Sequence, residues 1–200
     1  MGLELSFDAG QTPLDEEEKE GLRIASLTTK AELDELEQRN IEQAVRWTIE
    51  RRRKFDAREI LTEQFIMALH KRMFGDVWKW AGSFRSTDKN LGVSKYYIGT
   101  ELRKLLDDAA FWVENNSFPD DEIAIRFKHR IVSIHCFANG NGRHSRLMAD
   151  IIAEKLFGAP VFSWGAINLS AAGEARSKYL AALRDADKGD YKTLILFARS

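Results

Sequence analysis

Apolar residues recur at helical spacing along most of the chain. From residue 29 onward they fall three or four positions apart in successive segments, which places them on one face of an α-helix. Residues able to cap a helix precede several of these segments, and glycine follows several of them. The pattern therefore predicts helices over about 30–50, 62–75, 100–115, 120–135, 142–157, 170–188 and 190–198.

One segment departs from this pattern. Residues 83–98 are mostly polar, include Asn90 and Gly92, and alternate weakly between apolar and polar positions. Such alternation around turn-forming residues favours a short β-hairpin. We therefore expect an all-α fold class with one short hairpin, in a single domain over residues 29–200. Residues 1–28 are mixed and acidic, and we expect them to form an N-terminal arm outside the main core.

Length and charge limit the possible classes of function. A chain of 200 residues suits one hydrophobic core. The 30 basic and 31 acidic residues nearly balance, so the chain lacks the positive field of a non-specific nucleic-acid binder, and we expect no direct nucleic-acid binding. No apolar run approaches the roughly 18 residues that cross a bilayer, so we expect no membrane association. The lone cysteine, Cys136, excludes an internal disulfide and suits a reducing, cytoplasmic location.

The residues best suited to chemistry gather between positions 135 and 146. A glycine-rich turn, Gly140-Asn141-Gly142, opens a predicted helix. Unpaired backbone N–H groups at a helix start, together with the helix dipole, favour a bound phosphate. Arg143 and Arg146 follow in the first turn, three positions apart, so both guanidinium groups can hold further phosphate oxygens. Two cations at a helix start oppose the dipole, which indicates a bound polyanion.

His135 enters the same turn from the preceding helix. A histidine can act as a general base near neutral pH, so His135 can deprotonate a hydroxyl group. A general base that lies opposite a phosphate-binding turn suits attack by that hydroxyl on a nucleotide phosphate. The turn lacks the Lys-Ser/Thr pair of a Walker A loop, and no strand precedes it as in a Rossmann fold.

The segment from His135 to Arg146 resembles the Fic motif, His-x-Phe-x-(Asp/Glu)-Gly-Asn-Gly-Arg-x-x-Arg, at every specified position except that of Asn139. The resemblance extends over most of residues 30–198, including the stretch from His70 to Arg85. It implies a Fic-type helical bundle that acts as a protein adenylyltransferase (AMPylation), transferring AMP from ATP to a Ser, Thr or Tyr hydroxyl of a target protein. Segments 12–15 and 35–38 also resemble the Fic subgroup called mobile mystery protein B.

The resemblance also implies roles for the matching positions. The segment 83–98 is similar to the flap that binds the target by strand addition. Family members use the acidic position of the motif to help hold Mg²⁺ (or Mn²⁺), whereas Asn139 offers only a neutral carbonyl oxygen. An alternative function is therefore a nucleotide-binding regulator or toxin-module component with weak or no transfer activity. The implied assignments are His135 as the base, Gly140, Asn141 and Gly142 as the anion hole, and Arg143 and Arg146 as ligands of the outer phosphates.

The N-terminal arm matches a second Fic feature in part. Many Fic proteins are inhibited by a helix of the form (Ser/Thr)-x-x-x-Glu-(Gly/Asn), whose glutamate pairs with the last arginine of the motif. Glu20-Gly21 resembles the end of this pattern, although Glu16 stands at its first position. We hypothesise that Glu20 pairs with Arg146 and blocks the γ-phosphate, and the alternative is a solvated acidic helix. The sequence leaves open which nucleotide and target protein are used, and whether the chain forms a homo-oligomer.

Overall fold

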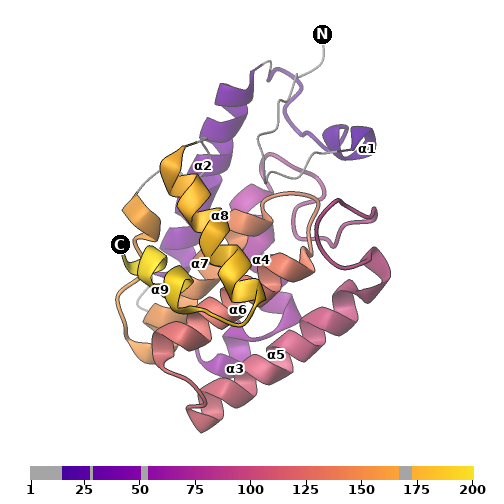
Figure 1. Ribbon diagram of the computed structural model, residues 1–200. Coiled ribbons are helices and arrows are strands. Elements are labelled where there is room, and N and C mark those ends of the chain that lie inside the picture. Colours follow the sequence, from indigo (N-terminus) through magenta and orange to yellow (C-terminus); the bar gives the residue numbers. More distant parts are fainter. Residues whose placement is uncertain (1–14, 28, 51–53, 167–172) are drawn as a thin grey trace.

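The computed structural model describes residues 15–27, 29–50, 54–166 and 173–200, and these residues are mostly helical (Figure 1). Within them, no helix combines the length and the apolar character needed to cross a membrane. The α-helices are α1 (Glu16–Lys19), α2 (Lys30–Thr48), α3 (Ala57–Ile60), α4 (Glu63–Phe74), α5 (Ile98–Asn115), α6 (Asp120–Ile134), α7 (Asn141–Ile151), α8 (Glu174–Asp187) and α9 (Lys192–Arg199).

Helices α6 and α7 pack against each other at the centre of the molecule. Helix α5 covers one side of α6, α2 pairs with α4, and α4 in turn contacts α7. The two C-terminal helices, α8 and α9, lie side by side in front of the central pair in Figure 1. The apolar stripe predicted for α6 is fully buried at Ile123, Phe127, Ile131 and Ile134, and each such side chain contributes roughly 1.5–3 kcal/mol to stability.

The predicted helix ends are confirmed where local capping groups define them. The hydroxyl of Thr29 accepts a hydrogen bond from the Glu32 backbone, and the Glu32 carboxylate accepts one from the Thr29 backbone, which is a capping box. The Thr62 hydroxyl caps α4 by accepting a hydrogen bond from the Phe65 N–H, and Gly75 follows the last residue of that helix. Helix α5 begins at Ile98, two residues before the predicted start at about residue 100. The predicted start of the helix over 170–188 lies outside the described residues.

The hairpin expected over residues 83–98 is not present. This segment, all of which is described, forms a loop without strands that ends in a 3₁₀ turn at Lys95–Tyr97. The backbone N–H of Arg85 donates to the Cys136 carbonyl (3.0 Å), and that of Val93 donates to the Ile134 carbonyl (3.3 Å). The two arms of the loop therefore bind the segment between α6 and α7 instead of each other.

The side chain of Arg85 holds this loop in shape. Its buried guanidinium group donates to the carbonyl oxygens of His135 (2.7 Å), Thr87 (2.7 Å) and Val93. A planar guanidinium with five N–H groups can reach several acceptors at once. Arg85 thus donates to carbonyls in both arms of the loop, at 87 and 93, and lies between the two arms.

The described part of the N-terminal arm packs against this loop and the segment after α4. The Arg23 N–H donates to the Val77 carbonyl, and the Lys79 N–H donates to the Gly21 carbonyl, both at 2.8 Å. The buried carboxylate of Glu18 pairs with the Lys89 ammonium group at 2.5 Å. Residues 15–27 are thus attached to the helical domain by backbone hydrogen bonds and by a buried charge pair.

Candidate active site

The turn between α6 and α7 begins and ends with left-handed backbone. His135 follows the last turn of α6 with φ 59° and ψ 60°, and Gly140 precedes α7 with φ 78°. A left-handed conformation costs a residue other than glycine about 1–2 kcal/mol, so the surrounding structure must stabilise His135 in this position. The Arg85 hydrogen bond to its carbonyl is one such contact.

The side chain of Asn141 closes the turn from inside. Its amide oxygen accepts a hydrogen bond from the Phe137 N–H (3.0 Å), and its amide nitrogen donates to the Phe137 carbonyl (2.8 Å). Phe137 is buried at the base of the turn. The polar side chain of Asn141 is therefore used within the protein, and its backbone N–H is the group left to face a ligand.

The two glycines of the turn meet different steric conditions. A β-carbon on Gly140 would lie 2.5 Å from the Phe74 ring, so only glycine fits between the turn and α4. A β-carbon on Gly142 would have no atom closer than 3.9 Å, that of the Arg146 guanidinium. Gly142 thus faces open space at the start of α7, where backbone N–H groups and the helix dipole favour an anion.

The His135 imidazole lies beneath the loop at residues 86–94. It is 6% exposed, and a β-carbon on Gly92 would lie 2.5 Å from its own β-carbon. Burial lowers the pKa of His135 from about 6.5 to about 4, and the positive charges of Arg85 and Lys89 act in the same direction. His135 is therefore neutral at physiological pH, the state in which it can accept a proton.

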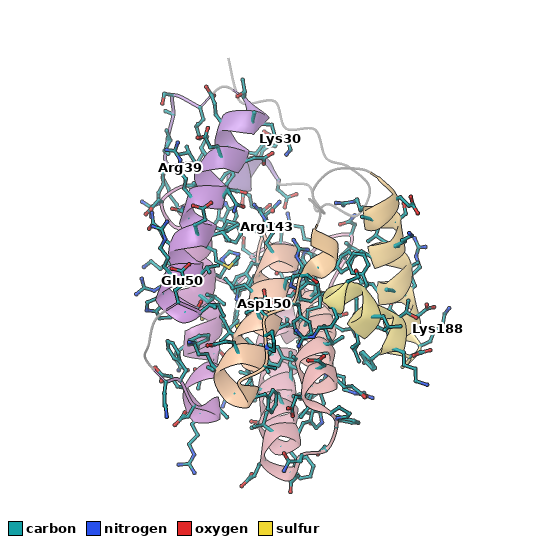
Figure 2. The ribbon with its side chains drawn as sticks, turned by 90° about the vertical axis from the view of Figure 1, so that its left-hand side faces the viewer. Lys30, Arg39, Glu50, Arg143, Asp150 and Lys188 are labelled. Carbon is teal, nitrogen blue, oxygen red and sulfur yellow. The ribbon has the colours of Figure 1, made fainter. Side chains whose placement is uncertain are left out.

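Arg143 forms an ion pair with an acidic residue far away in the sequence. Its guanidinium donates to the Glu37 carboxylate of α2 at 2.5 Å, while the second oxygen of Glu37 accepts a hydrogen bond from the Trp78 indole at 2.6 Å. Figure 2 shows Arg143 near the middle of the molecule, beside α2. Arg143 also lies over the Phe74 ring at 4.7 Å. The first motif arginine is thus held by a buried carboxylate in this structure.

Arg146 faces the C-terminal part of the molecule. Its guanidinium lies 6.0 Å from the centre of the Tyr179 ring of α8, and the buried Lys128 ammonium group lies 4.6 Å from the same ring. These two cations lower the pKa of the Tyr179 hydroxyl against the opposing effect of burial. Among the described residues, Arg146 makes no ion pair with Glu20, which is exposed after the end of α1.

Asn139 stands at the motif position that the resemblance assigned to a divalent cation. The side-chain oxygen of Asn139 accepts a hydrogen bond from the Gly140 N–H at 2.6 Å. No group of three or more His, Cys, Asp or Glu side chains in the described ranges could hold a metal ion. Magnesium prefers carboxylate oxygens and phosphate, and the position that would supply the carboxylate carries an amide instead.

Three residues of this site have no assigned role in the sequence analysis. Glu37 binds Arg143, which lies 106 positions later in the sequence, and Arg85 binds His135, 50 positions later. His70 binds Asn139, 69 positions later. An acidic residue in a charge-rich amphipathic helix gives no signal of such a contact. His70 and Arg85 lie in the stretch that resembled the region before the motif, which was the available signal for them.

Comparisons with known proteins agree with this geometry. Residues 60–153 match the model of the Fic/DOC family. The chain is 28% identical over 141 residues to "Protein adenylyltransferase fic-1" of Caenorhabditis elegans, an alignment that spans 66% of this chain and 25% of that protein. It is also 28% identical to "Protein adenylyltransferase Fic" of Drosophila grimshawi, over 68% of this chain and 28% of that one. The chain therefore spans only about a quarter of the length of these curated relatives.

Solved structures show the same fold. The structure of Fic-1 from C. elegans superposes with a TM-score of 0.65 at 20% identity, covering 90% of this chain and 51% of that one. BepC from Bartonella tribocorum, solved with bound AMPPNP, gives a TM-score of 0.63 at 16% identity and covers 96% of this chain and 93% of that one. The helical arrangement around the motif is thus shared with proteins of low sequence identity.

Proposed function

We propose that the Fic/DOC family domain formed by residues 60–153 transfers AMP from ATP to a hydroxyl side chain of a protein target. The observation that carries this proposal is a neutral His135 at one end of a turn whose other end is a phosphate-binding helix start with two arginines. The names of the relatives, protein adenylyltransferases, support the choice of AMP. Binding of AMPPNP by the structural neighbour BepC supports ATP as the nucleotide.

The residues present account for the steps of such a transfer. His135 removes the proton of the acceptor hydroxyl, whose oxygen attacks the α-phosphorus of ATP. The new bond joins that oxygen to phosphorus, the bond between the α-phosphorus and the bridging oxygen breaks, and pyrophosphate leaves. Backbone N–H groups at Asn141 and Gly142 hold the phosphate, joined by that of Gly140 once the Asn139 side chain releases it, while Arg143 and Arg146 neutralise charge on the leaving group.

A divalent cation bound with ATP would supply charge neutralisation on the phosphates. Asn139 supplies no charge to a cation, and its oxygen is already engaged with the Gly140 N–H. A divalent cation, Mg²⁺ or Mn²⁺, would therefore be held mainly by the phosphates of the nucleotide itself and by water. This weak protein contribution is the observation that favours the alternative function, a nucleotide-binding regulator or toxin-module component with little transfer.

We also propose that a carboxylate that pairs with one of the motif arginines, Arg143 or Arg146, inhibits the domain. The Glu37–Arg143 ion pair supports this idea, since a phosphate would have to displace Glu37 to reach that guanidinium. Glu20 is the competing assignment, and it would require α1 to move toward Arg146. Serine, threonine or tyrosine as the acceptor, a cytoplasmic location, a homo-oligomeric state and the mobile mystery protein B subgroup stay predictions from the sequence.

Labelling with α-³²P-ATP and Mg²⁺ or Mn²⁺ tests the transfer. The full chain is expected to label itself or a target protein, and His135→Ala is expected to lower labelling by about 10²-fold or more while ATP binding persists, because the base acts only in the reaction. His129→Ala is the matched control, since His129 is hydrogen bonded to Asp187 away from the turn. ATP binding without labelled product, in wild type and in a Glu37→Gln variant, would favour the regulator instead.

A further inference from the structure

We propose that His70 is a positioning residue for the proposed reaction, which fixes the orientation of the anion-binding turn through both of its ring nitrogens. This inference rests on the proposed function and concerns the same turn. His70 belongs to α4, is fully buried, and lies 65 positions before His135 in the sequence. It does not touch the reacting groups and acts through the backbone of the motif.

The hydrogen bonds of His70 determine which nitrogen carries the proton. The Gly82 N–H donates to Nδ1 at 3.0 Å, so Nδ1 must be unprotonated. Nε2 lies 3.0 Å from the Asn139 carbonyl oxygen, which can only accept, so Nε2 carries the hydrogen and donates. The ring is thus a neutral imidazole in one tautomer, with both nitrogens satisfied by backbone groups.

Aromatic neighbours hold the ring in this orientation. The Phe137 ring stacks on His70 with a centroid distance of 3.7 Å and an interplanar angle of 16°, and Phe74 lies at 4.8 Å. Burial lowers the pKa of His70 well below its ordinary value, which preserves the neutral form that the Gly82 contact requires. A rotated or protonated ring would lose one of its two hydrogen bonds.

Fixing the Asn139 carbonyl also fixes the direction of the Gly140 N–H, which donates to the Asn139 side chain in this structure. The carbonyl of Asn139 and the N–H of Gly140 belong to one planar trans peptide and point in opposite directions. Because the carbonyl points at His70, the N–H points away from α4, toward the side where the Asn139 side chain accepts it. Glycine at position 140 would tolerate a rotated peptide, so the backbone alone does not specify this orientation.

The second contact joins the turn to the loop over the base. Gly82 has φ 81° and lies three positions before Arg85, whose backbone and side chain bind Cys136 and His135. His70 therefore links the phosphate end of the turn to the start of the loop that covers His135. The His70 ring therefore determines both the direction of the Gly140 N–H and the start of the loop that covers His135.

Two isosteric substitutions separate the contacts of His70. In His70→Gln the amide nitrogen can take the place of Nε2 and donate to the Asn139 carbonyl, but the Gly82 contact is lost. In His70→Asn the amide oxygen can take the place of Nδ1 and accept from Gly82, but the side chain is too short to reach Asn139. Both variants lose the aromatic stack, so they are matched for that loss and are compared with each other.

The measurements are ATP binding by calorimetry and amide hydrogen exchange of residues 137–142 in the full chain. We expect His70→Asn to weaken ATP binding by about tenfold relative to His70→Gln, the effect of a misplaced hydrogen-bond donor, with similar unfolding midpoints for the two variants. Exchange at Gly140 is expected to accelerate in His70→Asn and to stay near the wild-type rate in His70→Gln.

The two possible failures give different results. If both variants show the same exchange at Gly140 and the same loss of ATP affinity, His70 has only a structural role and the inference is wrong. If the wild-type chain transfers no nucleotide while exchange still separates the two variants, the proposed reaction fails but the positioning of the turn by His70 is upheld.

Discussion

At the scale of single residues, burial changes proton affinity in several places around the motif. Asp150 of α7 accepts hydrogen bonds from the Phe162 N–H and the Trp164 indole, both at 3.1 Å. Burial raises the pKa of this carboxyl group to about 7, against the opposing effects of these hydrogen bonds and of Arg146 and Arg199. Asp150 thus links the end of α7 to the segment that follows it. Its carboxyl group is close to half protonated at neutral pH.

Asp150 predicts a specific dependence of stability on pH. In the unfolded chain its pKa is about 3.9, so between roughly pH 4 and pH 7 the folded state binds more protons, and stability falls as pH rises through this window. Asp150→Asn resembles the protonated form at every pH. We expect the variant to unfold at a higher temperature than wild type at pH 8, and at a similar temperature at pH 5.

Thermal unfolding followed by circular dichroism at the two pH values checks this expectation. Asp107→Asn on the exposed side of α5 is the control, because its charge is solvated and should not alter the difference between pH 5 and pH 8. An Asp150→Asn variant less stable than wild type at pH 8 would mean that the charged form is the one the fold prefers.

At the scale of elements, the loop at residues 83–94 depends on one side chain. Arg85→Lys keeps the charge but replaces the planar guanidinium by a single ammonium group, which cannot reach the separate carbonyls at 87, 93 and 135. An unsatisfied buried carbonyl, here that of His135, costs about 1–3 kcal/mol, and the part-buried carbonyls at 87 and 93 cost less, so we expect the free energy of unfolding to fall by roughly 2–4 kcal/mol. Cleavage by a protease within the loop is expected to accelerate as well.

Arg39→Lys on the exposed face of α2 provides the comparison for this substitution. Its ion pair with Glu35 is solvent-exposed, so the change should alter stability by less than about 0.5 kcal/mol. Equal stability of Arg85→Lys and wild type in urea denaturation would contradict the role given to the guanidinium.

The same loop shows why helices were predictable and the flap was not. Thr29, Thr62 and Gly75 define helix ends through groups within four positions, so the sequence pattern contains the necessary information. The backbone N–H groups of Arg85 and Val93 donate to Cys136 and Ile134 instead, some 40 to 50 positions away. Weak alternation over 83–98 predicted pairing within the segment and could not indicate that its partners lie elsewhere.

At the scale of the whole molecule, the site is assembled from helices far apart in the sequence. The motif residues from His135 to Arg146 were predictable because one short segment contains them. The contact between Glu37 and Arg143 was not, because it requires α2 to pack beside α7 with Trp78 supporting the same carboxylate. Sequence resemblance placed the inhibitory carboxylate in the N-terminal arm, whereas the carboxylate that contacts a motif arginine comes from the domain itself.

This arrangement predicts which carboxylate restrains the proposed nucleotide transfer. Glu37→Gln keeps an oxygen for the Trp78 indole but removes the charge facing Arg143, so the proposed nucleotide site becomes easier to occupy. We expect labelling by α-³²P-ATP to rise about tenfold, equivalent to about 1.4 kcal/mol. Glu20→Gln, at an exposed position without a contact to Arg146, is expected to leave labelling unchanged. The reverse result would assign inhibition to α1.

Gly92 adds a restriction of another physical kind. The close approach of the loop to His135 exists because position 92 lacks a methyl group, which would lie 2.5 Å from the His135 β-carbon. In the proposed reaction, the nucleotide side of the site would thus be restricted by the Glu37–Arg143 ion pair, and the acceptor side by the steric fit at Gly92. The two reactants therefore meet independent barriers, and a substitution that neutralises charge in α2 and one that changes volume in the loop should alter the entry of different substrates.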